Sequence, residues 1–486
     1  MPKKIISFQF IVFILLGTLL GLGVIAISGM PRRLLSMLIL GIAFPFVAAI
    51  FGDVRRFLLI CTVFSIPLII DVNFVHIMED QAGAHTLGVS LRDVFVILLL
   101  FFWILDLAGS EQKSFSFFAK ISVPAIIYIE VCLLTLLWAP RLDLATLEIF
   151  QMVKVFILYF VVANQIRDHQ DVKIVLWTLL ASVAFECVIA SLQMFFGNSL
   201  ALGFLGETQI RERDLSKLLR AGGTLGHPNR LAMFLELLLP LVLGAFLIEK
   251  RFLHRLAALG IFVFGMAAVI MTGSRGGWAA VFISMLIFLF LLFRHKRIGF
   301  GTVSGAFFIV LISAGVVLSI FSETVERRLF GEDYGSAIGR IPMFQVAFSV
   351  IEAHPIGGVG VNNYGEVMQQ YDDTILGRRF GELRRPVHNI YLLITGETGV
   401  IGLAVFLWLT LAVLQIISRT VNSTDRQLSI IGCGLFAGFC AYLLHGLVDK
   451  HLPGGNQQIY LLMALAVAVH KLSMREELSN SPAIDQ

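Results

Sequence analysis

The stretch GRIPMFQVAFSVIEAHPIGGVGVNNYG (residues 339–365) and the stretch RRPVHNIYLLITGETGVIGL (residues 384–403) join a loop rich in glycine and arginine to a long apolar segment. The apolar segment begins directly after His388, so this histidine lies where a water-facing loop meets a membrane helix. Residues 344, 347, 348 and 351 are apolar at helical spacing and predict an amphipathic helix on the outer surface of the membrane. The rest of the chain is expected to hold this junction.

The composition predicts an all-α polytopic membrane protein. Of the 486 residues, 57% are hydrophobic and only 14% are charged, whereas a soluble protein carries about 25% charged residues. Apolar runs predict about 12 to 14 transmembrane helices. These runs cover residues 5–27, 34–51, 57–70, 94–107, 121–138, 147–163, 172–196, 231–248, 256–272, 278–293, 302–321, 390–417, 430–447 and 459–470.

The basic residues predict the orientation in the membrane. With the N-terminus inside, the short cytoplasmic segments carry about three times as many Lys and Arg residues as the short outer loops. Both termini are therefore expected in the cytoplasm. The first apolar segment is expected to be a retained helix, because its run is long for a signal peptide and no small-residue cleavage site follows it.

The sequence predicts one membrane domain in three parts. Residues 1–196 form N-terminal transmembrane helices, and residues 197–472 form a membrane core that includes two long outer loops, residues 197–230 and 322–388. Residues 473–486 are expected to be a disordered cytoplasmic tail because they are polar. The five cysteines all lie in apolar runs without metal-ligand spacing, so neither a disulfide framework nor a zinc site is indicated.

Arginines in the two long outer loops are candidate anion ligands. The second loop carries arginine and no lysine, and the planar guanidinium can bind phosphate or carboxylate with two hydrogen bonds. Arg211, Arg340 and Arg385 are therefore predicted to bind substrate. The alternative is that such arginines form salt bridges on solvated helices, because acidic residues are also numerous in these loops.

The motif MTGSRGGW (residues 271–278) places Arg275 in a glycine-flanked turn between two membrane helices. Glycines allow a backbone to approach a ligand closely, and the free amides of the next helix favour an anion. The alternative role for Arg275 is anchoring at lipid headgroups.

The motif RAGGTLGHPNR (residues 220–230) brings Arg220, His227 and Asn229 to the mouth of the following helix, where His227 and Asn229 are candidate substrate ligands. Pro228 is placed to begin that helix, and the preceding glycines permit a tight entry turn. An isolated histidine such as His227 more often caps a helix or meets a headgroup than takes part in catalysis.

His388 is the candidate acid or base, because histidine titrates close to neutral pH. Its neighbour Asn389 is a candidate substrate ligand. The alternative for His388 is a structural role. Glu397 is nine residues further on, so an ideal helix would direct it to the opposite side and away from the imidazole.

Charged residues inside membrane segments are costly and usually paired or functional. Five qualify, and the only cation among them, Lys154, is expected to pair with one of the glutamates. They are Glu130, Lys154, Glu186, Glu236 and Glu397.

The motifs around Arg220, Arg275, residues 339–365 and His388, in this order, resemble those of the bacterial O-antigen ligase and O-antigen polymerase family. The resemblance covers about the last 270 residues, while the N-terminal helices match only in general character. Phe344 stands where the family pattern often has tryptophan, which is a mild departure.

The resemblance implies a C-type membrane glycosyltransferase that takes glycan from an undecaprenyl-pyrophosphate donor on the outer side of the bacterial inner membrane. It implies that Arg220 and Arg275 hold the pyrophosphate and that His388 assists the hydroxyl of a glycan or lipid A-core acceptor. We expect inverting transfer without metal, cofactor or nucleic acid, in contact with the lipid bilayer. The sequence does not separate ligation from polymerisation, and a transporter or flippase of lipid-linked oligosaccharides is the alternative class.

Overall fold

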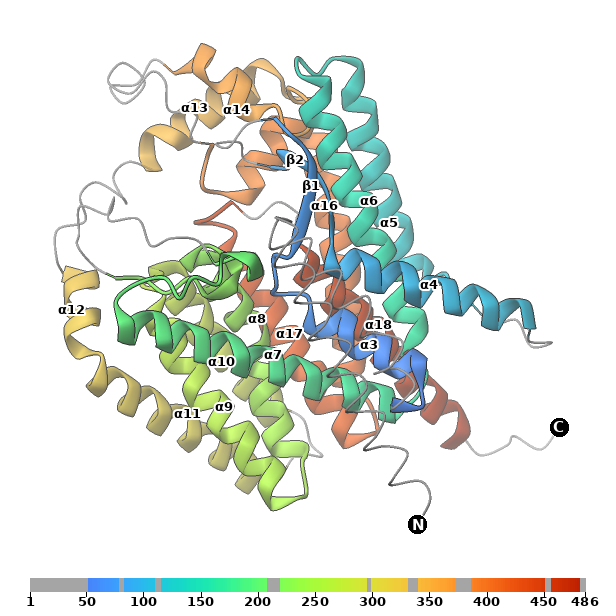
Figure 1. Ribbon diagram of the computed structural model, residues 1–486, viewed down its shortest axis with the longest axis vertical. Helices are drawn as coiled ribbons and strands as arrows, with labels where there is room; N and C mark the ends of the chain where they lie inside the picture. Colours follow the sequence, from blue (N-terminus) through green and yellow to red (C-terminus); the bar gives the residue numbers. More distant parts are fainter. Residues whose placement is uncertain are drawn as a thin grey trace, which may run out of the picture.

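The computed structural model describes residues 51–77, 83–109, 115–207, 219–294, 299–330, 340–372, 386–450 and 456–480. Figure 1 shows a helical bundle with one small hairpin near its centre. The strands are β1 (Asp71–His76) and β2 (Thr86–Ser90). The α-helices are α3 (Val54–Phe64), α4 (Leu91–Gly109), α5 (Ala119–Leu134), α6 (Leu142–Gln165), α7 (His169–Phe196), α8 (Pro228–Ile248), α9 (Phe252–Met271), α10 (Arg275–Arg294), α11 (Phe300–Ile320), α12 (Ser322–Phe330), α13 (Arg340–Ala353), α14 (Tyr364–Val367), α16 (Ile390–Val421), α17 (Arg426–His445) and α18 (Gln457–Asn480), with short 3-10 turns η1 (Thr135–Leu137), η2 (Gly203–Leu205), η3 (Gly223–Leu225) and η4 (Met368–Tyr371).

The predicted all-α polytopic membrane class is confirmed. Within the described residues, nine helices are long and apolar enough to cross a membrane: α5 with η1, α6, α7, α8, α9, α10, α11, α16 and α17. Each coincides with one of the predicted apolar runs. The first predicted span and all of the second except residue 51 lie outside the described residues.

The other three predicted spans form α3, α4 and α18, whose length or charged and polar residues differ from those of a simple membrane-crossing helix. α3 has only 11 residues, about 16 Å at 1.5 Å per residue, which is shorter than a bilayer core of about 30 Å. α4 carries Arg92, Asp93 and Asp106, and α18 continues as a helix through the polar sequence up to Asn480. The predicted disordered tail is therefore wrong for residues 473–480, where the Ser473 hydroxyl donates to Ser423 Oγ at 2.8 Å.

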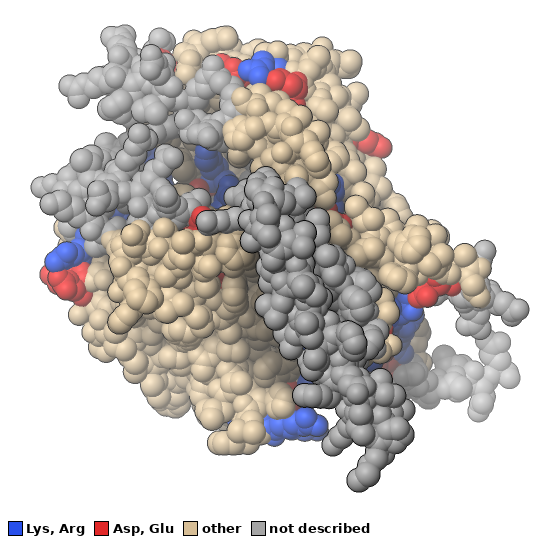
Figure 2. Space-filling model, in the orientation of Figure 1, with Lys and Arg blue, Asp and Glu red and all other residues tan. Residues whose placement is uncertain are grey.

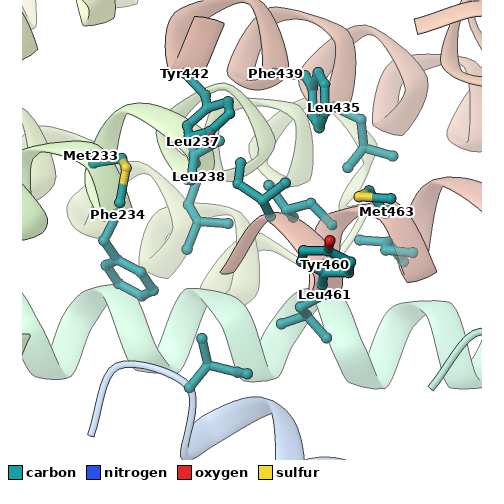
Figure 3. Close-up of a cluster of buried hydrophobic side chains, with 14 of the residues drawn as sticks. Met233, Phe234, Leu237, Leu238, Leu435, Phe439, Tyr442, Tyr460, Leu461 and Met463 are labelled. Atoms are coloured by element: carbon teal, nitrogen blue, oxygen red, sulfur yellow. The ribbon is translucent and has the colours of Figure 1, made fainter. Parts of the chain in front are cut away.

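The core of the bundle is the contact of α8 with α17 and α18. The apolar window of α8 is 89% buried, and Figure 3 shows its side chains meeting those of α17 and α18. Gly434 and Gly438 permit this close approach, because a Cβ on Gly438 would lie 2.2 Å from Leu237 O. Small residues four apart are a common basis for helix packing in membranes.

α16 is broken at Gly399, whose φ of 67° and ψ of −172° are not helical. The break exposes backbone groups that bind the glycine-rich loop: Val359 N donates to Gly396 O and Gly360 N donates to Glu397 O, both at 2.9 Å. On the other side, Val400 N donates to Pro355 O at 2.9 Å. The two stretches quoted from the sequence therefore form one structural unit. We call it the clamp: the loop of residues 354–363 bound to the GETG turn (residues 396–399) of α16.

The amphipathic helix predicted in residues 344–351 is α13, but its buried face differs from the prediction. Val346, Ala347 and Val350 are buried, whereas Phe348 is 60% exposed. The helix therefore packs on the bundle through smaller side chains than predicted. Large apolar residues are also favourable towards lipid, so their spacing alone does not identify the packed face.

The hairpin of β1 and β2 was not predicted, because residues 71–90 were interpreted as an outer loop. The strands are antiparallel, with an irregular register between Asn73 and Val75. Gly88 is required opposite Asn73, since a Cβ there would lie 2.4 Å from Asn73 Oδ1. The hairpin forms one wall of a cavity described below.

The connections group at two ends of the bundle, as the predicted topology requires. At one end, Asp171 is completely buried and pairs with Arg55 at 2.8 Å and Arg56 at 2.9 Å; these residues are all predicted to be cytoplasmic. We call the opposite end, which carries His388, the outer end.

Reporter fusions test this topology. A fusion after Lys250, between α8 and α9, is expected to report the cytoplasm, because basic residues cluster there. A fusion after Asp372 is expected to report the opposite compartment. Paired alkaline phosphatase and fluorescent-protein fusions measure both, and the same compartment for the two positions would contradict the assignment.

Gly399→Ala tests the clamp. A Cβ at Gly399 would lie 1.9 Å from Ile356 O, and its positive φ strains any other residue, so we expect a loss of at least about 2 kcal/mol of stability. The matched control is Gly305→Ala in α11, where a Cβ meets nothing within 4 Å. That variant should keep or raise the melting temperature; equal melting curves for the two variants would refute the clamp.

Candidate functional site

The candidate site at the outer end is organised around the carboxylate of Asp449, which follows α17. Its side chain is 5% exposed. Asn229 Nδ2 donates to Asp449 Oδ2 at 2.6 Å, and His388 Nδ1 lies 3.1 Å from Asp449 Oδ1. A buried carboxylate needs such partners, because burial without them is costly. One side chain thus connects the helix starts of α8 and α16.

Arg220 extends this network towards the turn before α10. Its Nε donates to Thr272 O and its Nη2 donates to Asn229 Oδ1, both at 2.8 Å. Gly273 has a φ of 58°, and a Cβ there would lie 3.3 Å from Arg220 Nε. The structure therefore brings Arg220 to the turn whose next helix begins with Arg275, as the prediction of a shared anion site requires.

A buried glutamate positions the loop that carries Arg220. Glu186 Oε2 accepts from Thr224 N at 2.9 Å, and its other oxygen accepts from the Thr224 hydroxyl. Gln193 Oε1 accepts from Gly223 N at 3.0 Å. Gly223 has no room for a side chain, since a Cβ would lie 2.1 Å from Glu186 Oε2. The intramembrane charge of Glu186 is thus used to position the loop.

His388 is held by its neighbours on both sides. Ile390 N donates to Gly446 O at 2.8 Å, which joins the start of α16 to the end of α17. Asn389 caps α16 by accepting from Tyr391 N and Leu392 N, and its Nδ2 donates to Leu447 O at 3.1 Å. The His388 side chain remains 30% exposed. Since Nδ1 faces Asp449, a proton on Nδ1 leaves Nε2 able to accept a proton from a substrate.

A second histidine and carboxylate pair lies beneath this site. His445 Nδ1 is 2.8 Å from Glu236 Oε2, with side-chain exposures of 2% and 0%. His445 Nε2 is 3.9 Å from Asp449 Oδ2, and a Cβ on Gly276 would lie 3.0 Å from the same nitrogen. His445 therefore links the turn of Arg275 to the carboxylates.

Of the other predicted substrate ligands, His227 and Arg340 are among the described residues. His227 caps α8, accepting from Asn229 N at 3.1 Å, and Pro228 begins the helix as predicted. Arg340 begins α13, close enough for its charge to act on His445. Arg211 and Arg385 lie outside the described residues.

Lys154 does not pair with a glutamate as predicted. Its Nζ binds Asp93 Oδ2 at 2.5 Å, because the β1–β2 hairpin brings the start of α4 to the middle of α6. Glu397 is buried in the clamp, where its backbone carbonyl accepts from Gly360 N at 2.9 Å.

Sequence reasoning missed Asp449, His445 and Arg328. Arg328, on α12, donates from Nε to Gly273 O at 2.9 Å, so it supports the turn before Arg275. Asp449 and His445 could have been found from the cluster HGLVDK (residues 445–450), because it places polar residues at the end of an apolar run. Figure 2 shows Lys and Arg atoms in a hollow below the region of α13.

The fold and site define a class: a multi-pass membrane protein with an arginine-bearing polar site at one end of its bundle, built around a histidine and carboxylate pair. Residues 258–407 match a family model described as O-Antigen ligase. This match confirms the resemblance found in the sequence: residues 258–407 are similar to the O-antigen ligase family. The matched segment includes Arg275 and His388 but not Arg220. No curated protein matches the chain.

Proposed function

We propose that the protein transfers a glycan from an undecaprenyl-pyrophosphate donor to an acceptor hydroxyl at the outer end. The observation that carries this proposal is the hydrogen-bonded chain from Arg220 through Asn229 and Asp449 to His388. It connects a cation suited to pyrophosphate with a base suited to a hydroxyl. The family match supports a membrane enzyme that transfers glycans.

In the proposed reaction, the acceptor oxygen attacks the anomeric carbon of the donor glycan. The bond from that carbon to the phosphate oxygen breaks, and its electron pair leaves with the pyrophosphate. His388 Nε2 accepts the acceptor's proton, and Asp449 stabilises the imidazolium that forms. Attack opposite the leaving group inverts the configuration.

The role proposed for Arg220 and Arg275 is to stabilise the charge that develops on the pyrophosphate, in place of a metal ion. Guanidinium groups form charge-assisted hydrogen bonds with phosphate oxygens. Arg220 is held in position by Thr272 and Asn229, so little ordering is required when the donor binds. Arg340 on α13 is the further candidate ligand for the glycan phosphate or its sugars.

Arg220→Ala and Arg275→Ala are each expected to lower turnover about a hundredfold, because a charge-assisted hydrogen bond is lost at a desolvated site. Lysine at either position should restore activity only in part, since it cannot form the two-pronged contact. Transfer from lipid-linked glycan is measured with purified protein in nanodiscs, together with melting temperature.

The matched control for the arginines is Arg327→Ala. Arg327 directly precedes Arg328 on α12. It is exposed and pairs with Glu323 at 2.5 Å. Its replacement should leave turnover unchanged. Full activity in either Arg220→Ala or Arg275→Ala would remove that residue from the donor site.

His388→Ala is expected to lower turnover by about a hundred- to ten-thousandfold, the usual cost of removing a general base, while donor affinity persists. Asp449→Asn should lower turnover to a similar degree, because the amide no longer fixes the tautomer or stabilises the imidazolium. Donor affinity and turnover are measured separately for each variant.

His354→Ala is the control for His388, since His354 is an exposed histidine of the same outer segment that contacts Tyr371 at 2.9 Å. It should retain normal turnover. His388→Gln should not restore activity if the ring is a base. Lost donor affinity at an unchanged melting temperature would instead move His388 into the pyrophosphate site.

A further inference from the structure

A polar cavity adjoins the candidate site on the side of the β1–β2 hairpin. Its volume is about 260 Å³, close to the lower end of the range for small-molecule sites, so it can hold a ligand the size of a sugar unit. Its walls are the hairpin, α6, the start of α8 and the start of α18. Arg220, Arg275 and His388 do not line it. However, Arg230 and Lys450 do, and they follow Asn229 and Asp449 directly in the chain.

Cations outnumber carboxylates on the cavity walls. The lining cations are Arg92, Lys154, Arg230 and Lys450, and the lining carboxylates are Asp71 and Glu148. Behind one wall, Asp93 binds both Arg92, at 3.0 Å, and Lys154, at 2.5 Å, so that one carboxylate faces two cations. The wall is fixed further because Lys154 Nζ donates to Gly88 O at 3.1 Å. The cavity thus keeps an excess of positive charge suited to one anionic group.

Two buried acceptors in the cavity have no hydrogen-bond partner among the described residues. They are Glu148 Oε1 and Gln458 Oε1, on side chains that are 1% and 7% exposed. Glu148 is held in place through its other oxygen, which accepts from Ala84 N at 2.7 Å. Buried polar atoms are normally satisfied, so these two acceptors point to a ligand that donates hydrogen bonds.

We propose that this cavity is a binding subsite for an anionic sugar, one that carries a carboxylate or a phosphate. Its charged group lies against Arg92 and Lys154, and its hydroxyl groups donate to Glu148 and Gln458. The amides of Asn73, Gln151 and Asn456, which also line the cavity, offer further hydrogen bonds of the kind that hydroxyl groups use.

The position of the cavity makes it a subsite for the glycan of the transfer reaction, and this part of the inference rests on the proposed function. Arg230 and Lys450 form the shared border with the network of Asp449. We place the reacting end of the glycan at His388 and its next sugar past these two residues, in the cavity. An acidic repeat unit would be selected over a neutral one, because a neutral sugar does not compensate the excess positive charge of the cavity walls.

Binding of defined oligosaccharides tests the proposal. Acidic probes bearing glucuronate, galacturonate or sugar phosphate are compared with neutral probes of the same length, using the full-length protein in neutral-lipid nanodiscs. The acidic series should contain a probe that binds at least about tenfold more tightly than its neutral counterpart. Lys154→Gln should remove most of this difference, and Lys154→Arg should preserve it.

Gln458→Leu gives a second test that does not depend on charge. Replacing an unpartnered buried acceptor with an apolar side chain should not lower the melting temperature. It should weaken the binding of acidic and neutral probes alike. Lys173→Gln is the control, because Lys173 is an exposed lysine paired with Glu249 at the opposite end of the bundle.

The proposal is overturned if no acidic probe is preferred, or if Lys154→Gln and Gln458→Leu bind like the unaltered protein. Equally tight binding of glycerophosphoglycerol, an anionic lipid headgroup, would overturn the assignment to a sugar. The binding assay requires no transfer. Retained acidic-probe binding in the His388→Ala variant would therefore uphold the cavity even if the proposed transferase activity failed.

Discussion

The buried carboxylate of Asp449 is the interaction on which the outer end depends. An ion in this position must be compensated by fixed donors, since its removal from water costs several kcal/mol. Asn229 and His388 provide them, and they belong to helix starts that are far apart in the chain. Satisfying one charge therefore fixes the relative positions of α8, α16 and α17. The same contacts place Arg220 beside the turn that precedes Arg275.

The clamp at Gly399 solves a second problem, which is how to attach a long irregular loop to a membrane helix. Unsatisfied backbone groups are not tolerated in such a helix. The break in α16 turns its free carbonyls towards the amides of Val359 and Gly360. The loop then leads into α14, and α16 carries His388 at its start. The clamp and the Asp449 carboxylate therefore hold the two ends of the outer segment that runs from residue 354 to His388.

Much of the membrane architecture could be predicted from the sequence, because lipid requires long apolar helices and each such run is visible directly. The start of α8 at Pro228 was also predictable from local chemistry. The partnership of His388 with Asp449 was not, since the two residues are 61 positions apart and neither lies in a periodic pattern that identifies a partner. The β1–β2 hairpin and the partner of Lys154 were missed because two short strands leave only a weak pattern.

The central claim is that donor pyrophosphate and acceptor base share one site at the outer end. The most direct test is a cryo-electron microscopy structure of the full-length protein in nanodiscs with undecaprenyl pyrophosphate bound. The account predicts that the phosphate oxygens lie within hydrogen-bonding distance of Arg220 and Arg275, with the terminal phosphate, to which the glycan is attached in the donor, facing His388. Density for the pyrophosphate beside Arg92 and Lys154, or away from both Arg220 and Arg275, would contradict the account.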